Sequence, residues 1–349
     1  MGDKMGFAII GCGNIAPFHV QGINCCPDAR LVAAADTDEG QSERFLEVNP
    51  DVAIFTDYLK LLKLSEVEVV CICTPSATHT DIAIEAARAH KHIICEKPLG
   101  TDLDRIDKMI KICRANKVKL TAIARRRAYP FFCKVKEAVS GGVLGRMVFG
   151  DAYMKYYRSP SYYKNAGWRS TWDIAGGGAL MNQGIHGLDL LRWIMGKVKA
   201  VCAKSGHLAR NIPVDDTTVA ILEFESGAYG VLQVSTSTNP GEPSRYMFHG
   251  DKGTIILSDS GIERWAVSKK PEIRAKDSPA EMLSKIEDEK KEGGSSEIPM
   301  GHAAQICDMV AAIKEDREPL VTPEDARDNV AVIQAIYESA RTGKEIVLG

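Results

Sequence analysis

Three polar residues with catalytic side chains follow a triple glycine near the middle of the chain. Asn182, His186 and Asp189 stand at positions i, i+4 and i+7 of a segment with helical periodicity, which predicts that they lie close to one helical face. The imidazole could accept or donate a proton at neutral pH, and the amide and carboxylate could orient a substrate. The same pattern is typical of a solvent-facing polar stripe, so other parts of the chain must distinguish the two.

A glycine-rich turn near the N-terminus offers a site for a dinucleotide. An apolar strand is followed by the run Gly11-Cys12-Gly13-Asn14-Ile15-Ala16 and then by a helical pattern. Gly11 permits the tight turn, Gly13 lets the backbone approach a pyrophosphate, and Ala16 replaces the third glycine of the G-x-G-x-x-G pattern. The phosphates would lie at the start of the helix. We therefore expect Gly11, Gly13, Asn14 and Ile15 to bind the cofactor.

A carboxylate follows the second expected strand, 31–35. Asp36 stands 23 residues after Gly13, where it could accept hydrogen bonds from the adenosine ribose. The next residues are Thr37 and Asp38, and no arginine lies nearby in sequence to bind a 2′-phosphate. The sequence therefore favours NAD over NADP.

The first 123 residues alternate between strand and helix, which predicts a parallel sheet. Further strands are expected at 52–55, 69–73, 92–95 and 119–123, with helices at 58–64, 81–90 and 103–116. In such a sheet ligands bind beyond the carboxyl ends of the strands. Thr74, Pro75, His79, Glu96 and Lys97 all fall in those loops, so we expect them in the cofactor site. Lys97 could also hydrogen-bond a substrate oxygen, although a surface ion pair is an alternative.

An aromatic region with arginines precedes the triple glycine, and we expect residues 158–172 to form an irregular loop. Aromatic rings and arginine suit a sugar, which has apolar ring faces and hydroxyl edges. We predict that Arg126, Trp168, Arg169 and Trp172 contact the substrate, as do Asn182 and Asp189. Ordinary packing of this segment onto a sheet is the alternative.

The remainder of the chain predicts an α+β second domain. Strands separated by short turns are expected between 198 and 267, and they form a mostly antiparallel sheet. The sheet face opposite the helices is a candidate interface for a homodimer or homotetramer. Residues 271–296 are expected to be a partly helical surface excursion, and 302–314 and 323–341 two closing helices.

Length and composition limit the classes of protein. The 349 residues favour two domains, which we place at 1–123 and 124–349, with the helix at 323–341 packing back on the first. A net charge of -2 creates no positive electrostatic field that would attract nucleic acid or an anionic membrane surface. No apolar run is long enough to span a bilayer. The ten cysteines form no metal-ligand pattern, and we expect a cytoplasmic protein with reduced thiols, no signal peptide and no metal.

The combination of motifs resembles the glucose–fructose oxidoreductase, inositol dehydrogenase and rhizopine catabolism (Gfo/Idh/MocA) family. The matching pieces are the glycine-rich turn, Asp36, Thr74-Pro75 with His79, Glu96-Lys97-Pro98, and Gly176-Gly177-Gly178 leading to His186 and Arg192-Trp193. The resemblance implies an α/β Rossmann domain plus an α+β domain with a large, mostly antiparallel open sheet. It also implies NAD-dependent oxidation or reduction of a secondary alcohol on a sugar or cyclitol, with Lys97 contacting the substrate oxygen and His186 as acid/base.

Asn182 departs from the family pattern, in which an aspartate is common four residues before the histidine. A neutral amide would not stabilise an imidazolium, so we expect His186 near Lys97 to be neutral and to act as a base. Family members acting at C3 of glycosides or nucleotide-linked sugars are similar in carrying asparagine there. Two alternatives are an NAD-dependent glycosidase acting through transient C3 oxidation and a non-catalytic NAD-bound sensor.

Overall fold

The computed structural model describes residues 4–165, 167–268 and 300–349. The chain divides into two compact units. The first comprises Met1–Tyr129, Thr171–Gly176 and Ser296–Ala331, and the second comprises Pro130–Ser170, Gly177–Ser295 and Val332–Gly349. Both units are therefore assembled from separated stretches of sequence. The partly helical surface excursion expected at 271–296 lies outside the described residues.

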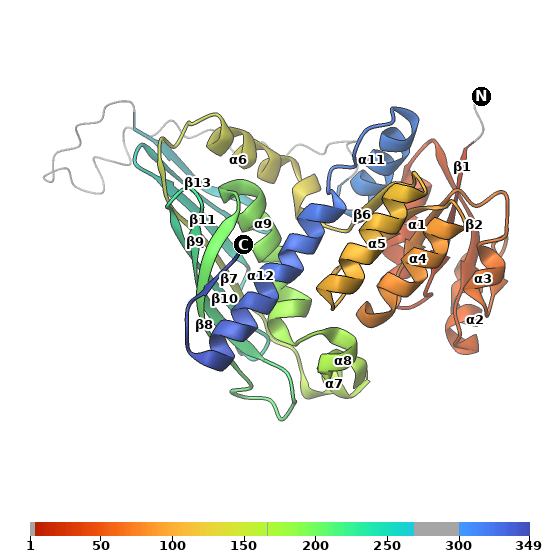
Figure 1. Ribbon diagram of the computed structural model, residues 1–349, viewed down its shortest axis with the longest axis horizontal. Coiled ribbons are helices and arrows are strands. Elements are labelled where there is room, and N and C mark those ends of the chain that lie inside the picture. The colour runs from red at the N-terminus through yellow and green to blue at the C-terminus, as the bar shows by residue number, and fades with distance from the viewer. Residues whose placement is uncertain (1–3, 166, 269–299) are drawn as a thin grey trace, which may run out of the picture. The chain divides into compact units, whose positions relative to one another are not determined.

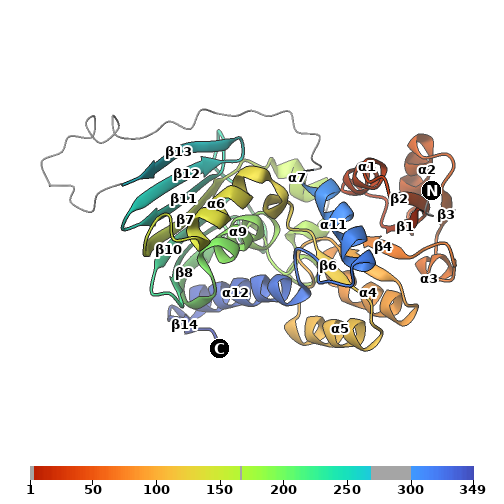
Figure 2. The ribbon, with the colours of Figure 1, turned by 90° about the horizontal axis from the view of Figure 1, so that it is seen from above.

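The first unit is a doubly wound α/β fold with a six-stranded parallel sheet in the order β3-β2-β1-β4-β5-β6. Its strands are β1 (Met5–Ile10), β2 (Ala29–Ala35), β3 (Ala53–Phe55), β4 (Val69–Ile72), β5 (His92–Cys95) and β6 (Leu120–Ala122). Its helices are α1 (Ala16–Cys25), α2 (Glu39–Val48), α3 (Tyr58–Leu61), α4 (His79–Arg88), α5 (Leu103–Ala115), α8 (Trp172–Ala175) and α11 (His302–Lys314). Figures 1 and 2 show α1 and α11 side by side on one face of this sheet and α4 and α5 on the other.

Continuous apolar runs explain the position of the first sheet. All six residues of β1 and all four of β4 are buried, as expected of parallel strands covered on both faces. Phe7 and Ile9 of β1 share a core with Ile23 of α1 and Ile306 of α11. The carboxyl ends of β1, β2, β4 and β5 carry the four loops that the sequence singled out.

The second unit contains an eight-stranded sheet in the order β13-β12-β11-β7-β10-β9-β8-β14. All pairs are antiparallel except β7 with β10. The strands are β7 (Met147–Lys155), β8 (Val198–Gly206), β9 (Thr217–Phe224), β10 (Tyr229–Ser235), β11 (Arg245–Gly250), β12 (Gly253–Ser258), β13 (Gly261–Val267) and β14 (Ile346–Val347). The fold class expected from the sequence is confirmed for both units.

Helices cover one face of the large sheet. They include α6 (Pro130–Ser140) and α9 (Ile185–Met195), which lie together over the strands in Figure 2. The helix α12 (Pro323–Thr342) begins in the first unit and ends in the second. The strands alternate accordingly: in β9, Thr218, Ala220 and Leu222 are buried, whereas Val219 and Ile221 are exposed.

Two local expectations were wrong. Residues 158–172 are not an irregular loop but contain α7 (Pro160–Asn165) and a 3-10 turn (Gly167–Ser170), because Pro160 can begin a helix at its first position. The segment after the triple glycine is not one α-helix either. Leu180–Gly184 forms a π-helical turn before α9 begins at Ile185, so the wider turn changes the angle between Asn182 and His186.

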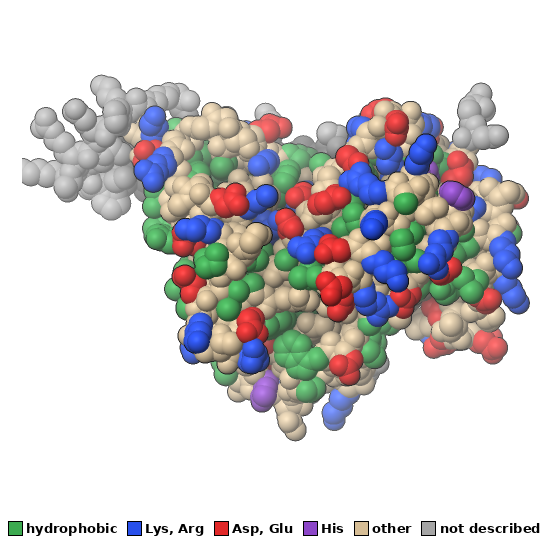
Figure 3. Space-filling view, viewed as in Figure 1, with side chains coloured by type: hydrophobic (Ala, Val, Ile, Leu, Met, Phe, Trp, Pro, Cys, Tyr) green, Lys and Arg blue, Asp and Glu red, His purple; other side chains and the backbone are tan. Residues whose placement is uncertain are grey.

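The ionic side chains are mixed in sign over the visible surface. Figure 3 shows lysine and arginine interspersed with aspartate and glutamate, without a broad patch of one sign on that face. This agrees with the net charge of -2. Among the described residues, no helix combines the length and apolar character needed to cross a bilayer.

Candidate active site

The glycine-rich loop after β1 is shaped for close approach by a ligand. Gly11 has φ of +98°, and a Cβ there would lie 2.8 Å from the carbonyl carbon of Cys73, so a larger residue would be strained. A Cβ on Gly13 would meet nothing within 4 Å, which leaves that side of the loop open. No side chain caps the start of α1. The loop therefore fits a pyrophosphate at a helix N-terminus.

Asp36 holds the glycine-rich loop from the end of β2. Its Oδ2 accepts a hydrogen bond of 2.7 Å from the backbone N–H of Cys12, and its Oδ1 accepts one of 2.9 Å from Asp38. Each carboxylate oxygen can accept two hydrogen bonds, so each keeps one position for a further donor. The side chain is half-buried, which leaves it accessible to such a donor. This geometry fits an acceptor for ribose hydroxyls, as the sequence indicated.

The loops after β4 and β5 are joined through one buried imidazole. His79 Nδ1 lies 2.8 Å from the carbonyl oxygen of Pro98, and its Nε2 lies 2.8 Å from that of Thr74. Burial lowers the pKa of His79, against the opposing effect of these two carbonyls. Because the side chain is buried, His79 joins the two loops from the protein interior and does not line an open surface.

Glu96 is the centre of a second buried cluster. Its Oε1 accepts hydrogen bonds of 3.0 Å from Nε2 of both His19 and His302, and its Oε2 accepts one of 3.2 Å from the backbone N–H of Lys97. Among the described residues, His19, Glu96 and His302 are the group with metal-ligand atoms within 4.8 Å of one another. Neither histidine was predicted as a site residue.

Hydrogen bonding explains this cluster better than metal ligation does. A neutral histidine that binds a metal through Nε2 carries its proton on Nδ1, and that N–H normally has an acceptor. His19 Nδ1 is buried without a hydrogen-bond partner in the described parts of the chain. A proton on Nε2, donated to Glu96, avoids a buried unsatisfied N–H.

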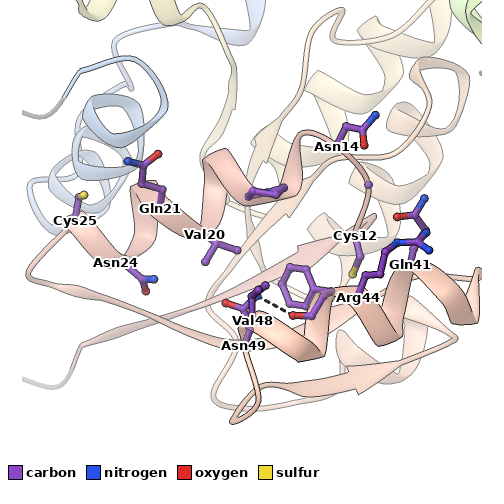
Figure 4. Close-up of a pocket in the computed structure, with 13 residues that line it drawn as sticks. Cys12, Asn14, Val20, Gln21, Asn24, Cys25, Gln41, Arg44, Val48 and Asn49 are labelled. Atoms are coloured by element: carbon purple, nitrogen blue, oxygen red, sulfur yellow. Dashed lines mark hydrogen bonds between the residues drawn. The ribbon is translucent and has the colours of Figure 1, made fainter. Parts of the chain in front are cut away.

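A pocket of about 530 Å³ lies between α1 and α2 beside the glycine-rich loop. It is lined by Cys12, Gly13, Asn14, Pro17, Val20, Gln21, Asn24, Cys25, Gln41, Arg44, Phe45, Val48 and Asn49. Figure 4 shows Arg44 extending from α2 toward Gln41 and Cys12. No arginine directly follows Asp36 in sequence, but the fold brings Arg44 to the same pocket as the glycine-rich loop. None of the predicted catalytic residues lines this pocket.

In the second unit, Tyr162 connects Asn182 to the predicted substrate loop. Asn182 Nδ2 donates a hydrogen bond of 3.2 Å to the Tyr162 hydroxyl oxygen. The guanidinium of Arg169 lies 5.2 Å from the Tyr162 ring centre and 5.0 Å from that of Trp168. Such cation–π packing orients the arginine while leaving its N–H groups able to bind. Tyr162 belongs to the aromatic segment 158–172 but was not predicted as a site residue.

A buried carboxylate holds the start of the helical segment that carries Asn182 and His186. Asp215 accepts hydrogen bonds from the backbone N–H groups of Gly178 and Leu180, at 2.7 and 2.8 Å. The hydroxyl of Tyr337 donates to the same carboxylate at 2.7 Å. Negative charge at the start of a helix is stabilising. Asp215 and Tyr337 lie far away in sequence, so no local pattern revealed them.

The remaining predicted residues differ in accessibility. Asn182 and His186 are half-buried, whereas Asp189 is 4% exposed and lies inside the second unit. In the first unit Arg126 is buried and Trp172 is exposed. The substrate roles assigned to these residues stay predictions.

Two family models match the chain. Residues 5–123 match the NAD-binding Rossmann fold of the GFO/IDH/MocA oxidoreductase family, and residues 136–348 match its C-terminal alpha/beta domain. The chain belongs to the GFO/IDH/MocA oxidoreductase family. The family resemblance, the fold class and the assignment as an NAD-dependent oxidoreductase are thereby confirmed.

Several relatives of this oxidoreductase have names or bound ligands. It is 30% identical to myo-inositol 2-dehydrogenase of Thermotoga maritima, covering 73% of this chain and 75% of that protein. It is 32% identical to the uncharacterized oxidoreductase YrbE of Bacillus subtilis, covering 72% and 73%. The WlbA dehydrogenase of Bordetella pertussis, crystallised with NADH and UDP-GlcNAcA, is 29% identical with a TM-score of 0.85, and the match covers 99% of both chains.

Proposed function

We propose that this oxidoreductase interconverts a secondary alcohol and a ketone on a sugar that carries an anionic group, such as a nucleotide-linked uronic acid, with C3 as the reacting carbon. In the oxidising direction His186 accepts the hydroxyl proton while Lys97 hydrogen-bonds that oxygen. The carbon–oxygen double bond forms as the carbon-bound hydrogen leaves with its electron pair. Bound NAD supplies the hydride acceptor.

The observation that carries the anionic substrate is the arginine-rich surroundings of Asn182. Arg169 and Arg158 both pack over the Tyr162 ring, at 5.2 and 5.5 Å from its centre, and Tyr162 accepts a hydrogen bond from Asn182. Guanidinium groups are the side chains best suited to bind carboxylate or phosphate with paired hydrogen bonds. A neutral cyclitol offers only hydroxyl oxygens, which bind a guanidinium group more weakly than a carboxylate or phosphate does.

The relatives support the same choice. The similarity to the WlbA dehydrogenase, whose structure contains an acidic nucleotide sugar, spans nearly the whole of both chains. The match to the inositol dehydrogenase covers about three quarters of each. Asn182 also supports the proposal, because its neutral amide leaves His186 free to act as a base.

The direct test is NADH formation with NAD and a substrate panel. The panel contains UDP-linked uronic acids, their neutral UDP-hexose counterparts, free uronic acids and myo-inositol. We expect turnover with an anionic sugar to exceed that with its neutral counterpart. Turnover of myo-inositol alone would contradict the proposal, as would release of an aglycone without NADH, which identifies a glycosidase.

A matched pair of variants locates the anion site. Arg169→Gln should raise KM for the anionic sugar about tenfold to hundredfold, because a hydrogen bond to a charged group contributes about 1.5–3 kcal/mol. Lys164→Gln removes an exposed positive charge from α7 and should leave KM within about twofold. Equal effects of both variants would indicate general electrostatic attraction and contradict a specific role for Arg169.

We also propose that the open face of the large sheet forms a homodimer or homotetramer interface. Ile221, Tyr229 and Phe149 are 54%, 53% and 44% exposed and occupy neighbouring strands. An apolar patch of this kind marks an interaction surface. We further propose a cytoplasmic location, because the ten free cysteines suit a reducing compartment.

A further inference from the structure

The cluster around Glu96 brings together three separate elements of the first unit. His19 lies in α1, Glu96 directly follows β5, and His302 is the first residue of α11. Both imidazoles donate to Glu96 Oε1 at 3.0 Å. The rings of His19 and His302 contact each other edge to face, with centres 5.0 Å apart. Glu96 is therefore held from two directions.

The two histidines make a buried carboxylate tolerable. Burial alone would raise the pKa of Glu96, but hydrogen bonds from His19 and His302 hold it well below its ordinary value. Burial also lowers the pKa of His19, so this ring is neutral at pH 7 and donates from Nε2. A buried carboxylate without such donors is strongly destabilised. The histidine N–H groups thus keep Glu96 ionised in a water-poor position.

Glu96 also holds the peptide from which Lys97 extends. Its second oxygen accepts the Lys97 backbone N–H at 3.2 Å, so the carboxylate links the histidine pair to the lysine turn. We propose that His302 is a positioning residue for Lys97: through Glu96 it fixes the turn from which the lysine reaches the substrate oxygen. The inference rests on the proposed function, which gives Lys97 its contact with substrate.

The other titratable groups around Glu96 in the described part of the chain do not replace the histidine donors. Besides His19 and His302, the titratable groups that Glu96 acts on are His79 of α4 and the thiols of Cys71, Cys73 and Cys95 from β4 and β5, and the neighbouring Lys97 acts on His79. Both ring nitrogens of His79 already face backbone carbonyls. Burial raises the pKa of the three thiols, so they stay neutral. Loss of His302 therefore leaves Glu96 with fewer donors.

The test compares His302→Leu, which removes the donor, with His302→Gln, whose amide can still donate. His302→Leu should lower kcat about tenfold to hundredfold, the effect of losing a hydrogen bond to a charged group. The KM for NAD should stay within about twofold. The acid limb of the kcat–pH profile should move to higher pH, because Glu96 loses a hydrogen-bond donor and becomes easier to protonate. His302→Gln should restore kcat to within about threefold of the original protein.

A control removes a comparable imidazole from the other end of β5. His92 accepts a hydrogen bond from the Lys119 backbone N–H at 2.9 Å and does not contact Glu96. His92→Gln should leave kcat and the acid limb unchanged. An unchanged kcat and pH profile in His302→Leu, or equal losses in the Leu and Gln variants, would overturn the inference.

A measurement independent of turnover separates this inference from the proposed function. Carboxyl ¹³C NMR can follow Glu96 during a pH titration, with Glu96→Gln used to assign its signal. The titration should shift upward in His302→Leu even if the substrate panel is wrong. If no sugar is turned over but the Glu96 titration shifts, the result counts against the proposed function and supports the role of His302. An unshifted Glu96 titration would overturn the role of His302.

Discussion

Asp36 provides the sharpest test of how this chain selects its cofactor. Its carboxylate already accepts N–H groups from Cys12 and Asp38 at 2.7 and 2.9 Å, and we predict that the ribose hydroxyls of NAD bind the same carboxylate. Asp36→Ala removes all of these acceptors. Asp36→Asn keeps one acceptor oxygen and removes the charge. The two variants therefore separate hydrogen bonding from charge repulsion.

The expected magnitude follows from these contacts. A hydrogen bond to a charged group contributes about 1.5–3 kcal/mol, so Asp36→Ala should weaken NAD binding about tenfold to hundredfold. The glycine-rich loop also loses its tie to β2, which adds to the effect. Asp36→Asn should lower the preference for NAD over NADP about tenfold, because a carboxylate beside the 2′-phosphate is repulsive. Arg44, in the pocket beside the glycine-rich loop, would favour the same phosphate.

Isothermal titration calorimetry with NAD and NADP measures both effects directly. Asp38→Asn is the matched control, because it removes a nearby charge while retaining an acceptor for the N–H of Gln41 at the start of α2. It should change NAD affinity by less than about threefold. NAD affinity unaltered in Asp36→Ala, or equal changes in the Asp36 and Asp38 asparagine variants, would refute the reasoning.

Three further predictions concern stability and assembly. Tyr337→Phe should lower the free energy of unfolding in urea by about 1.5–3 kcal/mol, because Asp215 loses a buried donor. Ile221→Lys should convert the proposed homodimer or homotetramer to a smaller species in light scattering, because it places charge on the apolar sheet face. Acid should destabilise the first unit, because burial lowers the pKa of His19 and His92 in the folded protein. The unfolded chain, in which the histidine pKa is about 6.5, therefore binds more protons than the folded protein once the pH falls below that value. The free energy of unfolding should then fall by up to about 1.4 kcal/mol per pH unit for each ring.

Each of these predictions has a matched comparison. Tyr157→Phe alters an exposed tyrosine and should leave the unfolding energy unchanged; equal losses would refute the Asp215 argument. Leu208→Lys alters a residue that is 77% exposed and outside the strands, and should leave the mass unchanged. An unchanged mass in Ile221→Lys would refute the interface. Urea unfolding at pH 7.5, 6.5 and 5.5 tests the acid effect, which a constant or rising stability at pH 5.5 would contradict.

The first unit could be predicted well because its signals are local. Gly11, Gly13 and Asp36 stand at spacings set by a single β-α-β unit, and the buried strands read as continuous apolar runs. Glu96 and Lys97 were correctly placed at the end of a strand. The roles assigned to these residues in binding and catalysis stay predictions.

The parts that could not be predicted depend on contacts between distant residues. Glu96 accepts from His302, which is 206 positions away, and no motif links the two. Asp215, which accepts the N–H groups of Gly178 and Leu180 at the start of the π-helical turn, lies 37 and 35 positions away from them, and no motif links the two segments. Helical periodicity assumes a regular turn, so it placed Asp189 beside His186 and could not detect that Asp189 is buried.

The order of synthesis gives the long-range contacts a consequence for folding in the cell. Tyr337 is made 122 residues after Asp215, and His302 is made 206 residues after Glu96. Both sheets can pair their main strands earlier, but neither buried carboxylate has all its donors until the closing helices emerge. A nascent chain or a product shortened before residue 300 would therefore keep much of the parallel sheet and lack its finished lysine turn. The emergence of α11 and α12 is therefore the step at which both buried carboxylates gain their last hydrogen-bond donors.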